Sequence, residues 1–269
     1  MSRIETKLAQ VKSDGKTALI PYITAGDSHP GLTVPLMHAM VEAGADAIEL
    51  GVPFSDPMAD GPTIQLACER ALKHNVSLTD VFAMVQAFRQ QDNETPVILM
   101  GYLNPLEAMG YEKFAVDAKA AGVDGMLTVD LPPEEADDLL GPLKSQGIDA
   151  IFLLSPTTRQ HRIERIVEAG SGYLYYVSLK GVTGSNALDV DDVKKHVDNI
   201  KQSTDLPVGV GFGIKDAETA AAVAEVSDAV VVGSVLVKVI ENNAGDDATI
   251  IRHIAELLRD MRQAMDKTL

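Results

Sequence analysis

One carboxyl group stands inside an otherwise apolar run of the sequence. Glu49 lies in the stretch 47–50 (AIEL), which is short and hydrophobic in the way of a strand buried on both faces. Because moving a lone carboxylate out of water is costly, such a group must be paired, protonated or used in chemistry. A structural carboxylate held by backbone amides or by an arginine fits the same pattern, so Glu49 alone leaves both interpretations open.

A long loop with two more carboxylates follows this run. Residues 51–62 (GVPFSDPMADGP) include three prolines and two glycines along with Asp56 and Asp60. Ordered loops of this length tend to carry function. Each aspartate also suits an Asx turn or a cap before the proline that follows it. The loop therefore supplies a second candidate acid, Asp60, close in sequence to Glu49.

Glycine-rich stretches follow the last three strands that we expect. They are residues 181–185 (GVTGS), 211–214 (GFGI) and 233–234 (GS). In parallel barrels the loops after the last strands form a recurrent phosphate site, where backbone N–H groups and a helix N-terminus face the ligand. Because the two later stretches contain no Lys or Arg, amide dipoles and the Ser234 hydroxyl would hold a phosphate there.

The sequence lacks the residues of two other kinds of catalytic site. No lysine falls within an expected strand, and Lys180 is the nearest candidate for a Schiff base. The six histidines are scattered without His-x-His or Glu-x-x-His spacing, which predicts that there is no metal site. The pattern that remains favours acid–base chemistry on a sugar-phosphate-like compound.

Charge and cysteine content narrow the partners and the compartment. The net charge is −16, from 39 acidic and 23 basic residues, and a surface this acidic repels nucleic acid and anionic membranes. Cys68 is the single cysteine, and the N-terminal residues carry charges without the apolar core of a signal peptide. The longest apolar run, 229–237, is too short to span a membrane. We therefore expect a cytoplasmic protein.

The elements that would position these groups recur along the chain. A turn of the form Gly-x-Asp precedes an apolar run at 44–46, 122–124 and 147–149, and a related turn with serine in place of glycine occurs at 225–230. Glycine suits the left-handed position that ends a helix, so each repeat indicates a helix end followed by a strand. Strands are predicted at 18–23, 46–50, 96–100, 124–129, 149–154, 173–178, 207–211 and 228–232. Helices are predicted at 2–13, 30–43, 62–73, 78–90, 111–121, 133–146, 160–169, 190–202, 216–225 and 247–266.

This alternation predicts the fold class. Eight strands that alternate with helices indicate an α/β protein with a parallel sheet. Eight strands also suit closure, so we predict that residues 1–269 form a single (β/α)8 barrel, the TIM barrel, with an extra N-terminal helix. An open, doubly wound sheet fits the same pattern.

Several motifs together resemble the tryptophan synthase alpha subunit family. The most specific is 50–65 (LGVPFSDPMADGPTIQ), and residues 181–184 (GVTG) and 211–214 (GFGI) follow at the separations that the family shows. Residues 21–27 (PYITAGD) and 100–105 (MGYLNP) match as well, and the resemblance covers about residues 15–265. It implies a lyase of tryptophan biosynthesis, which cleaves indole-3-glycerol phosphate into indole and glyceraldehyde 3-phosphate.

The resemblance also implies roles for individual residues. Glu49 would protonate C3 of the indole ring and then take the proton of the C3′ hydroxyl, while Asp60 would stabilise the positive charge at the indole N–H. Tyr175 would help to position Glu49 and the substrate, and Thr183 would lie in a loop that closes over the ligand. The indole pocket would be lined by Tyr22, Met100, Leu127, Leu153 and Phe212, and the phosphate would be bound by Gly184, Gly213, Gly233 and Ser234.

A partner protein follows from the same resemblance. Alpha subunits of this family bind a beta subunit in an α2β2 heterotetramer, and pyridoxal phosphate belongs to the beta subunit, so this chain would need no cofactor. Asp56 would contact the partner. The chain departs from the family pattern at Tyr22, Met58 and residues 179–180, which bears on affinity and loop closure rather than on the reaction.

Two other functions fit parts of the pattern. The first is another phosphate-binding barrel enzyme of the same pathway, and the indole-glycerol phosphate synthase among these would need a strand lysine that this chain lacks. The second is a non-catalytic subunit that kept the fold, which loss of Glu49 or Asp60 would signal.

Overall fold

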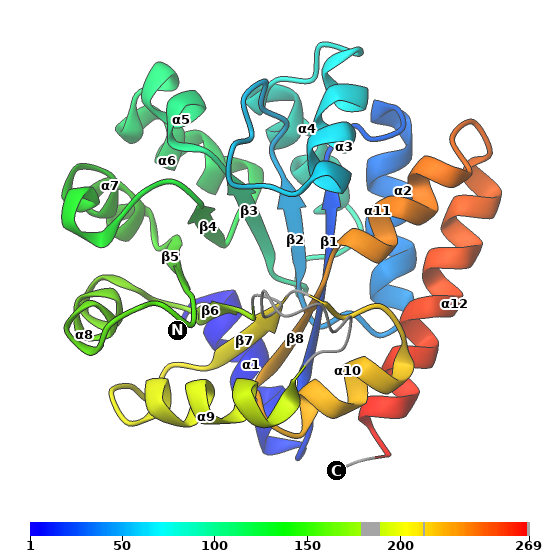
Figure 1. Cartoon of the computed structure of the whole chain (residues 1–269). Helices are drawn as coiled ribbons and strands as arrows, with labels where there is room; N and C mark the ends of the chain where they lie inside the picture. Colours follow the sequence, from blue (N-terminus) through cyan, green and yellow to red (C-terminus); the bar gives the residue numbers. More distant parts are fainter. Residues whose placement is uncertain (179–188, 212, 268–269) are drawn as a thin grey trace.

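Eight parallel strands form a closed barrel with helices around it (Figure 1). The computed structural model describes residues 1–178, 189–211 and 213–267. The strands pair in chain order, and β1 also pairs with β8, where Ala18 lies opposite Ala229. This last pairing closes the sheet. It confirms the predicted barrel and excludes the open sheet that fitted the sequence equally well.

The predicted strands are all present, and their ends differ from the prediction by at most two residues. They are β1 (Ala18–Thr24), β2 (Ile48–Gly51), β3 (Val97–Gly101), β4 (Gly125–Thr128), β5 (Asp149–Leu154), β6 (Leu174–Val177), β7 (Val208–Gly211) and β8 (Ala229–Val232). The helices are α1 (Arg3–Ser13), α2 (Pro30–Glu42), α3 (Pro62–Leu72), α4 (Leu78–Phe88), α5 (Leu103–Met109), α6 (Tyr111–Ala121), α7 (Asp137–Gln146), α8 (Gln160–Ala169), α9 (Val190–Lys201), α10 (Ala217–Ala224), α11 (Ser234–Asn242) and α12 (Asp247–Met265). A short 3-10 helix, η1 (Pro133–Glu135), precedes α7 and replaces the first turn of the helix predicted at 133–146.

Two helices, α5 and α11, were not predicted. Helix α5 is short and has Pro105 in its first turn, a position where proline is tolerated although it reads as a break. Helix α11 directly follows β8, and Val235, Val237 and Val239 extend the apolar run of that strand without a turn signal. Within the described ranges, no helix combines the length and apolar character needed to cross a membrane.

The recurring Gly-x-Asp turn has the conformation that the sequence predicts. Gly44, Gly122 and Gly147 have φ of +105°, +95° and +64°, in the region that side chains with a Cβ rarely adopt. At the fourth repeat Ser227 instead donates its hydroxyl to the carbonyl oxygen of Val223, at 2.8 Å. Each repeat therefore ends one helix and directs the chain into the next strand.

Three aspartates of these turns, Asp46, Asp124 and Asp228, connect neighbouring strands at the floor of the barrel, which is the end where the strands begin. Asp46 accepts a hydrogen bond from the backbone N–H of Leu19 on β1, at 2.9 Å. Asp124 does the same for the N–H of Val97 on β3, at 2.9 Å. Because each aspartate precedes its own strand, it ties the start of that strand to the strand before it.

A second contact joins each of these aspartates to the helical layer. Asp228 accepts from the Val208 N–H at 2.8 Å and also pairs with Lys201 on α9 at 2.9 Å. Asp46 pairs with Arg262 on α12 at 3.2 Å, and Asp124 pairs with the residue that follows α4, Arg89, at 2.7 Å. The floor is therefore a ring of carboxylates that link strands to helices.

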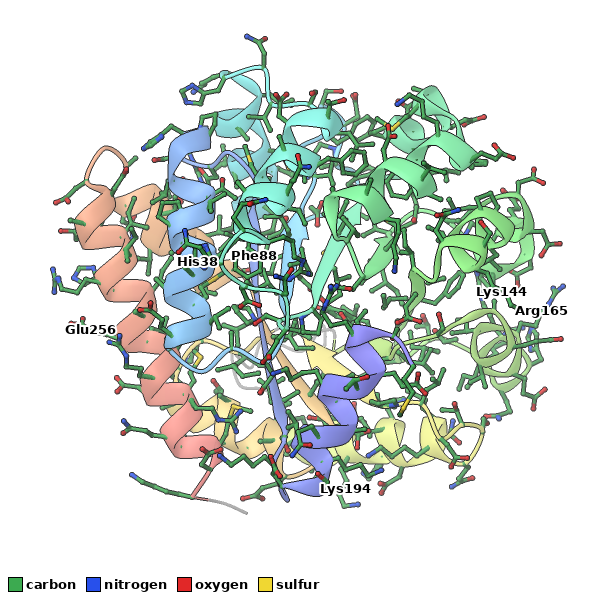
Figure 2. The ribbon with its side chains drawn as sticks, turned by 180° about the vertical axis from the view of Figure 1, so that it is seen from behind. His38, Phe88, Lys144, Arg165, Lys194 and Glu256 are labelled. Carbon is green, nitrogen blue, oxygen red and sulfur yellow. The ribbon has the colours of Figure 1, made fainter. Side chains whose placement is uncertain are left out.

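Helix α1 closes the floor from outside. Figure 2 shows it lying across the barrel in the view from behind. Its buried residues Ile4, Leu8 and Val11 pack in one cluster with inward-facing residues of the strands, such as Ile20 and Ile98. The floor is thus covered by apolar side chains, and the opposite end, where the strands finish, is the mouth of the barrel.

We expect Asp124→Ala to lower the free energy of unfolding by about 3–5 kcal/mol, because it removes the buried carboxylate that pairs with Arg89 and Arg3 and accepts from the Val97 N–H. Urea titration of the full chain measures this. The matched control is Asp198→Ala, which breaks the exposed Lys194–Asp198 pair and should cost about 0–1 kcal/mol (Figure 2). Equal losses in the two variants would contradict a role for the floor ring in stability.

Candidate active site

Glu49 lies on β2 with Tyr22 of β1 and Ile98 of β3 beside it. Its side chain is fully buried, and the hydroxyl of Tyr173 at the start of β6 donates a short hydrogen bond to its Oε1 atom. Its other oxygen, Oε2, is buried with no hydrogen-bond partner among the described residues. The carboxyl is therefore turned into the barrel and is bonded to a tyrosine, not to an arginine.

This environment brings the pKa of Glu49 close to neutrality. Burial disfavours the charged form and raises the pKa to about 7, although the hydrogen bond from Tyr173 lowers it in part. A carboxyl with such a pKa is populated in both protonation states near pH 7. It can thus both donate and accept a proton, as a single acid–base group must.

Two tyrosines reach toward the same space and depend on glycines for room. A Cβ placed on Gly51 would lie 2.2 Å from the hydroxyl of Tyr22, and one on Gly211 would lie 2.1 Å from the hydroxyl of Tyr175. Burial raises the pKa of both tyrosines well above the usual value, and the negative charges of Glu49 and Asp60 raise it further. Both phenols therefore lie within electrostatic reach of the two candidate acids.

Apolar side chains predicted to line a ring-binding pocket face the interior on neighbouring strands. Met100 on β3 lies opposite Leu127 on β4, and Leu153 follows on β5. Leu127 is fully buried, whereas Met100 and Leu153 are half-buried and pack against the same interior cluster as Tyr175. These side chains give Glu49 an apolar neighbourhood in which a flat ring could pack.

Asp60 is held at the end of the loop between β2 and α3 by Tyr102. The Tyr102 hydroxyl donates to Asp60 Oδ2 at 2.9 Å and accepts from the Ala59 N–H at 2.9 Å. Its ring stacks on Phe54, with centroids 5.2 Å apart, and Gln65 donates to the Asp60 carbonyl oxygen at 2.9 Å. Burial raises the pKa of Asp60, and the Tyr102 hydrogen bond opposes that rise.

The predicted phosphate-binding residues are only partly described. Gly213 follows β7 with φ of +84°, and Gly233 is the residue that precedes the first turn of α11, with Ser234 next to it and exposed. A Cβ on Gly233 would lie 3.5 Å from the Cβ of Tyr22, so this helix start adjoins the interior pocket. Thr183, Gly184 and Phe212 lie outside the described residues. The N-terminus of α11, a helix that the sequence did not predict, supplies the helix start that we expected at the phosphate site.

The tip of the loop between β2 and α3, which carries Asp60, faces solvent. Asp56 is exposed and accepts a hydrogen bond from the Ser55 hydroxyl at 2.5 Å. Met58 is 79% exposed, which is uncommon for a large apolar side chain in a water-facing loop. One loop therefore joins the candidate acid Asp60 to an exposed surface with an apolar residue.

Tyr173 and Tyr102 are site residues that the sequence analysis missed. Tyr102 stands within the quoted motif 100–105, directly after β3, so its place at a strand end was an available signal. Tyr173 lies 124 residues from Glu49 and gave no such signal. No group of His, Cys, Asp and Glu side chains suited to a metal ion occurs in the part of the chain that the structure describes.

A hollow of about 770 Å³ lies beside the mouth, between the loops that follow β4 and β5. It is lined by Leu153, Ser155 and Arg159 among others, but Glu49 is not part of its wall. The buried carboxyl and its tyrosines, rather than this hollow, therefore mark the candidate site of chemistry.

Comparisons with known proteins agree on one family. The sequence model of the family described as "Tryptophan synthase alpha chain" matches residues 8–266. Proteins of that name from Thioalkalivibrio sulfidiphilus and Marinobacter nauticus are both 62% identical over 266 residues, covering 99% of this chain and 100% and 98% of those proteins. The structure of tryptophan synthase subunit alpha from Legionella pneumophila superposes with a TM-score of 0.93 at 49% identity, over 99% of each chain. A structure of Mycobacterium tuberculosis tryptophan synthase gives a TM-score of 0.88 at 34% identity, over 98% of each chain.

We expect Tyr173→Phe to raise the pKa of Glu49 above about 7, because the lost hydrogen bond is the one that favours the ionised carboxyl. Titration of the glutamate side-chain carboxyls by carbon-13 NMR measures this, and Glu49→Gln identifies the signal. Tyr111→Phe, on α6, is the control and should leave the titration unchanged. A pKa that stays the same or falls in Tyr173→Phe would show that the hydrogen bond does not set the acidity of Glu49.

Proposed function

The chain belongs to the tryptophan synthase alpha chain family, and we propose that Glu49 and Asp60 perform the family's reaction inside the mouth of the barrel. The protein is thus a carbon–carbon lyase, which cleaves indole-3-glycerol phosphate into indole and glyceraldehyde 3-phosphate in tryptophan biosynthesis. The observation that carries the proposed site is the buried Glu49 carboxyl, with one oxygen bonded by Tyr173 and the other unpartnered in the described structure.

Glu49 acts first as an acid and then as a base. Its protonated form donates to C3 of the indole ring, and the carboxylate that results takes the proton of the C3′ hydroxyl. The electrons of that O–H bond form the aldehyde carbonyl, while the electrons of the breaking C3–C3′ bond return to the indole ring. The carboxyl ends the cycle protonated, and a pKa of about 7 allows both transfers near neutral pH.

Asp60 stabilises the charge that C3 protonation creates on the indole nitrogen. Its carboxylate accepts a hydrogen bond from the ring N–H, and it does so best while ionised. The Tyr102 hydrogen bond supports the ionised form and fixes the direction of the side chain. Tyr22, Met100, Leu127 and Leu153 then pack against the ring, and Tyr175 orients the substrate between the two acids.

The phosphate of the substrate binds at the opposite side of the pocket. Gly213, Gly233 and Ser234 present backbone N–H groups and a hydroxyl, and the start of α11 adds its dipole. In the same proposal, Gly184 also binds the phosphate and Thr183 contacts the substrate. The stretches 211–214 and 233–234 contain no lysine or arginine, so backbone N–H groups would bind the phosphate dianion there.

The alpha chain works together with a beta chain in an α2β2 complex, and pyridoxal phosphate belongs to the beta chain. Asp56 lies at the contact with that partner in our proposal, and the exposed Met58 supplies an apolar surface beside it. Because this loop also carries Asp60, a partner that touches it can influence the indole end of the site.

We further propose that residues 1–269 form one domain that acts in the cytoplasm. The packing of α1 and α12 against one barrel supports a single domain. The one cysteine, Cys68, is buried and has no disulfide partner, as suits a reducing compartment.

Glu49→Gln tests the central assignment. The amide can neither donate nor accept the proton in this cycle, so indole release should fall by roughly 10²- to 10⁴-fold. Affinity for glycerol 3-phosphate should stay within about twofold of wild type, because the phosphate end is untouched. The control is Glu256→Gln, an exposed change on α12 that should leave turnover unchanged. Near-normal turnover in Glu49→Gln would overturn the mechanism.

Substitutions at the loop tip test the partner contact. Asp56→Lys and Met58→Asp should each weaken binding of the beta chain by about tenfold or more, because each places a wrong charge on a surface that becomes buried. Titration calorimetry of the alpha chain with purified beta chain measures the affinity. Asp198→Lys on α9 serves as the control. Unchanged affinity in both loop variants would remove this loop from the interface.

A further inference from the structure

A single arginine joins three segments behind the active site. Arg70 on α3 donates from Nε and Nη2 to the two carboxylate oxygens of Asp27, at 2.6 and 2.9 Å. It also donates from Nη1 to Glu241 on α11, at 3.3 Å. Asp27 is fully buried in the loop after β1, and only 17% of the Arg70 side chain is exposed. The proposed mechanism uses none of these three residues.

Helices α3 and α11 already touch each other along an apolar seam. Ala67 of α3 and Val237 of α11 are fully buried and pack with Tyr22 of β1 in one cluster. Arg70 is one turn after Ala67, and Glu241 is one turn after Val237, so the polar contact extends the same seam. The adjacency of the two helices beside β1 is visible in Figure 1.

The beginnings of these two helices lie at opposite ends of the proposed substrate site. Helix α3 starts at Pro62, directly after Asp60, and α11 starts at Ser234, directly after Gly233. With a rise of about 1.5 Å per residue, Arg70 and Glu241 lie roughly 10–12 Å along their helices from those starts. A contact at this depth limits how far the two helix starts can move relative to each other.

We propose that Arg70 is a positioning residue that sets the distance between Asp60 and the amide groups at the start of α11. This inference rests on the proposed function, in which Asp60 binds the indole end and α11 binds the phosphate end of one substrate. The two-point bond to Asp27 fixes the guanidinium to the barrel, and its third bond holds α11. In Arg70→Lys the positive charge is kept, but the planar set of guanidinium donors that bonds both Asp27 and Glu241 is lost.

The test compares ligands that occupy one end of the site with a ligand that occupies both. The one-ended ligands are indole and glycerol 3-phosphate. The two-ended ligand is an unreactive analogue in which a propyl chain joins the indole ring to phosphate. The variants are Arg70→Lys and Glu241→Ala in the full chain, with and without the beta chain. Controls with the same residue types are Arg252→Lys and Glu256→Ala, which alter an exposed ion pair within α12.

We expect Arg70→Lys to weaken binding of the two-ended analogue by about tenfold or more. A small displacement of the binding groups is costly when one ligand must contact both of them. The dissociation constants of indole and of glycerol 3-phosphate should stay within about twofold of wild type. Glu241→Ala, which leaves the buried Asp27–Arg70 pair intact, should show the same pattern to a smaller degree. Calorimetry gives the three affinities, and kcat for cleavage should fall together with affinity for the analogue.

Two results would overturn the inference. Equally weakened binding of all three ligands would indicate a general loss of structure. Unchanged affinity for the analogue would show that the Arg70 contacts do not set the distance between Asp60 and the start of α11. If Arg70→Lys does not fold, the Glu241→Ala comparison decides. Failure of the proposed function gives a different result in chains that keep Arg70. In that case Asp60→Asn leaves indole binding unchanged, and Glu49→Gln keeps near-normal turnover.

Discussion

The structure depends on keeping one carboxyl group out of water. Glu49 has no solvent exposure, and burial moves its pKa from the usual 4.5 to about 7, which corresponds to roughly 3 kcal/mol of disfavoured charge. An interior that stays dry requires a sealed floor, and the apolar face of α1 provides that seal. A single donor, Tyr173, then limits the rise in pKa. The pKa of Glu49, the proposed acid–base residue, therefore depends on the whole barrel.

Carboxyl groups at the two ends of the barrel differ in how fully they are hydrogen-bonded. At the floor, Asp46, Asp124 and Asp228 are each satisfied by a strand N–H and a helix cation. Toward the mouth, Glu49 has one oxygen without a described partner. Fully satisfied groups hold a structure rigid, whereas an unsatisfied group retains the capacity to bind a ligand. The carboxyl group thus serves two purposes, according to which of its hydrogen bonds the neighbouring residues complete.

The sequence was sufficient where the signal is local. Short apolar runs after Gly-x-Asp turns predicted the strands. The position of Glu49 inside such a run identified it as a candidate acid. It was insufficient where the partner is distant, because Tyr173 and Arg70 acquire their roles only when strands or helices far apart in sequence become neighbours. Closure itself is decided by the β1–β8 pairing, which no local pattern contains. Helix α11 was missed because its valines continue a strand-like run, so packing rather than propensity determines its form.

In the proposed mechanism, the different surroundings of the two acids suit two different roles. A group that gives and takes a proton must change its charge easily, so it benefits from burial with one donor, as at Glu49. A group that stabilises a cation must keep its charge, so it benefits from some solvent contact and a firm donor, as at Asp60 with Tyr102. In this proposal, proton transfer takes place at the fully buried Glu49, and charge stabilisation takes place at the partly buried Asp60.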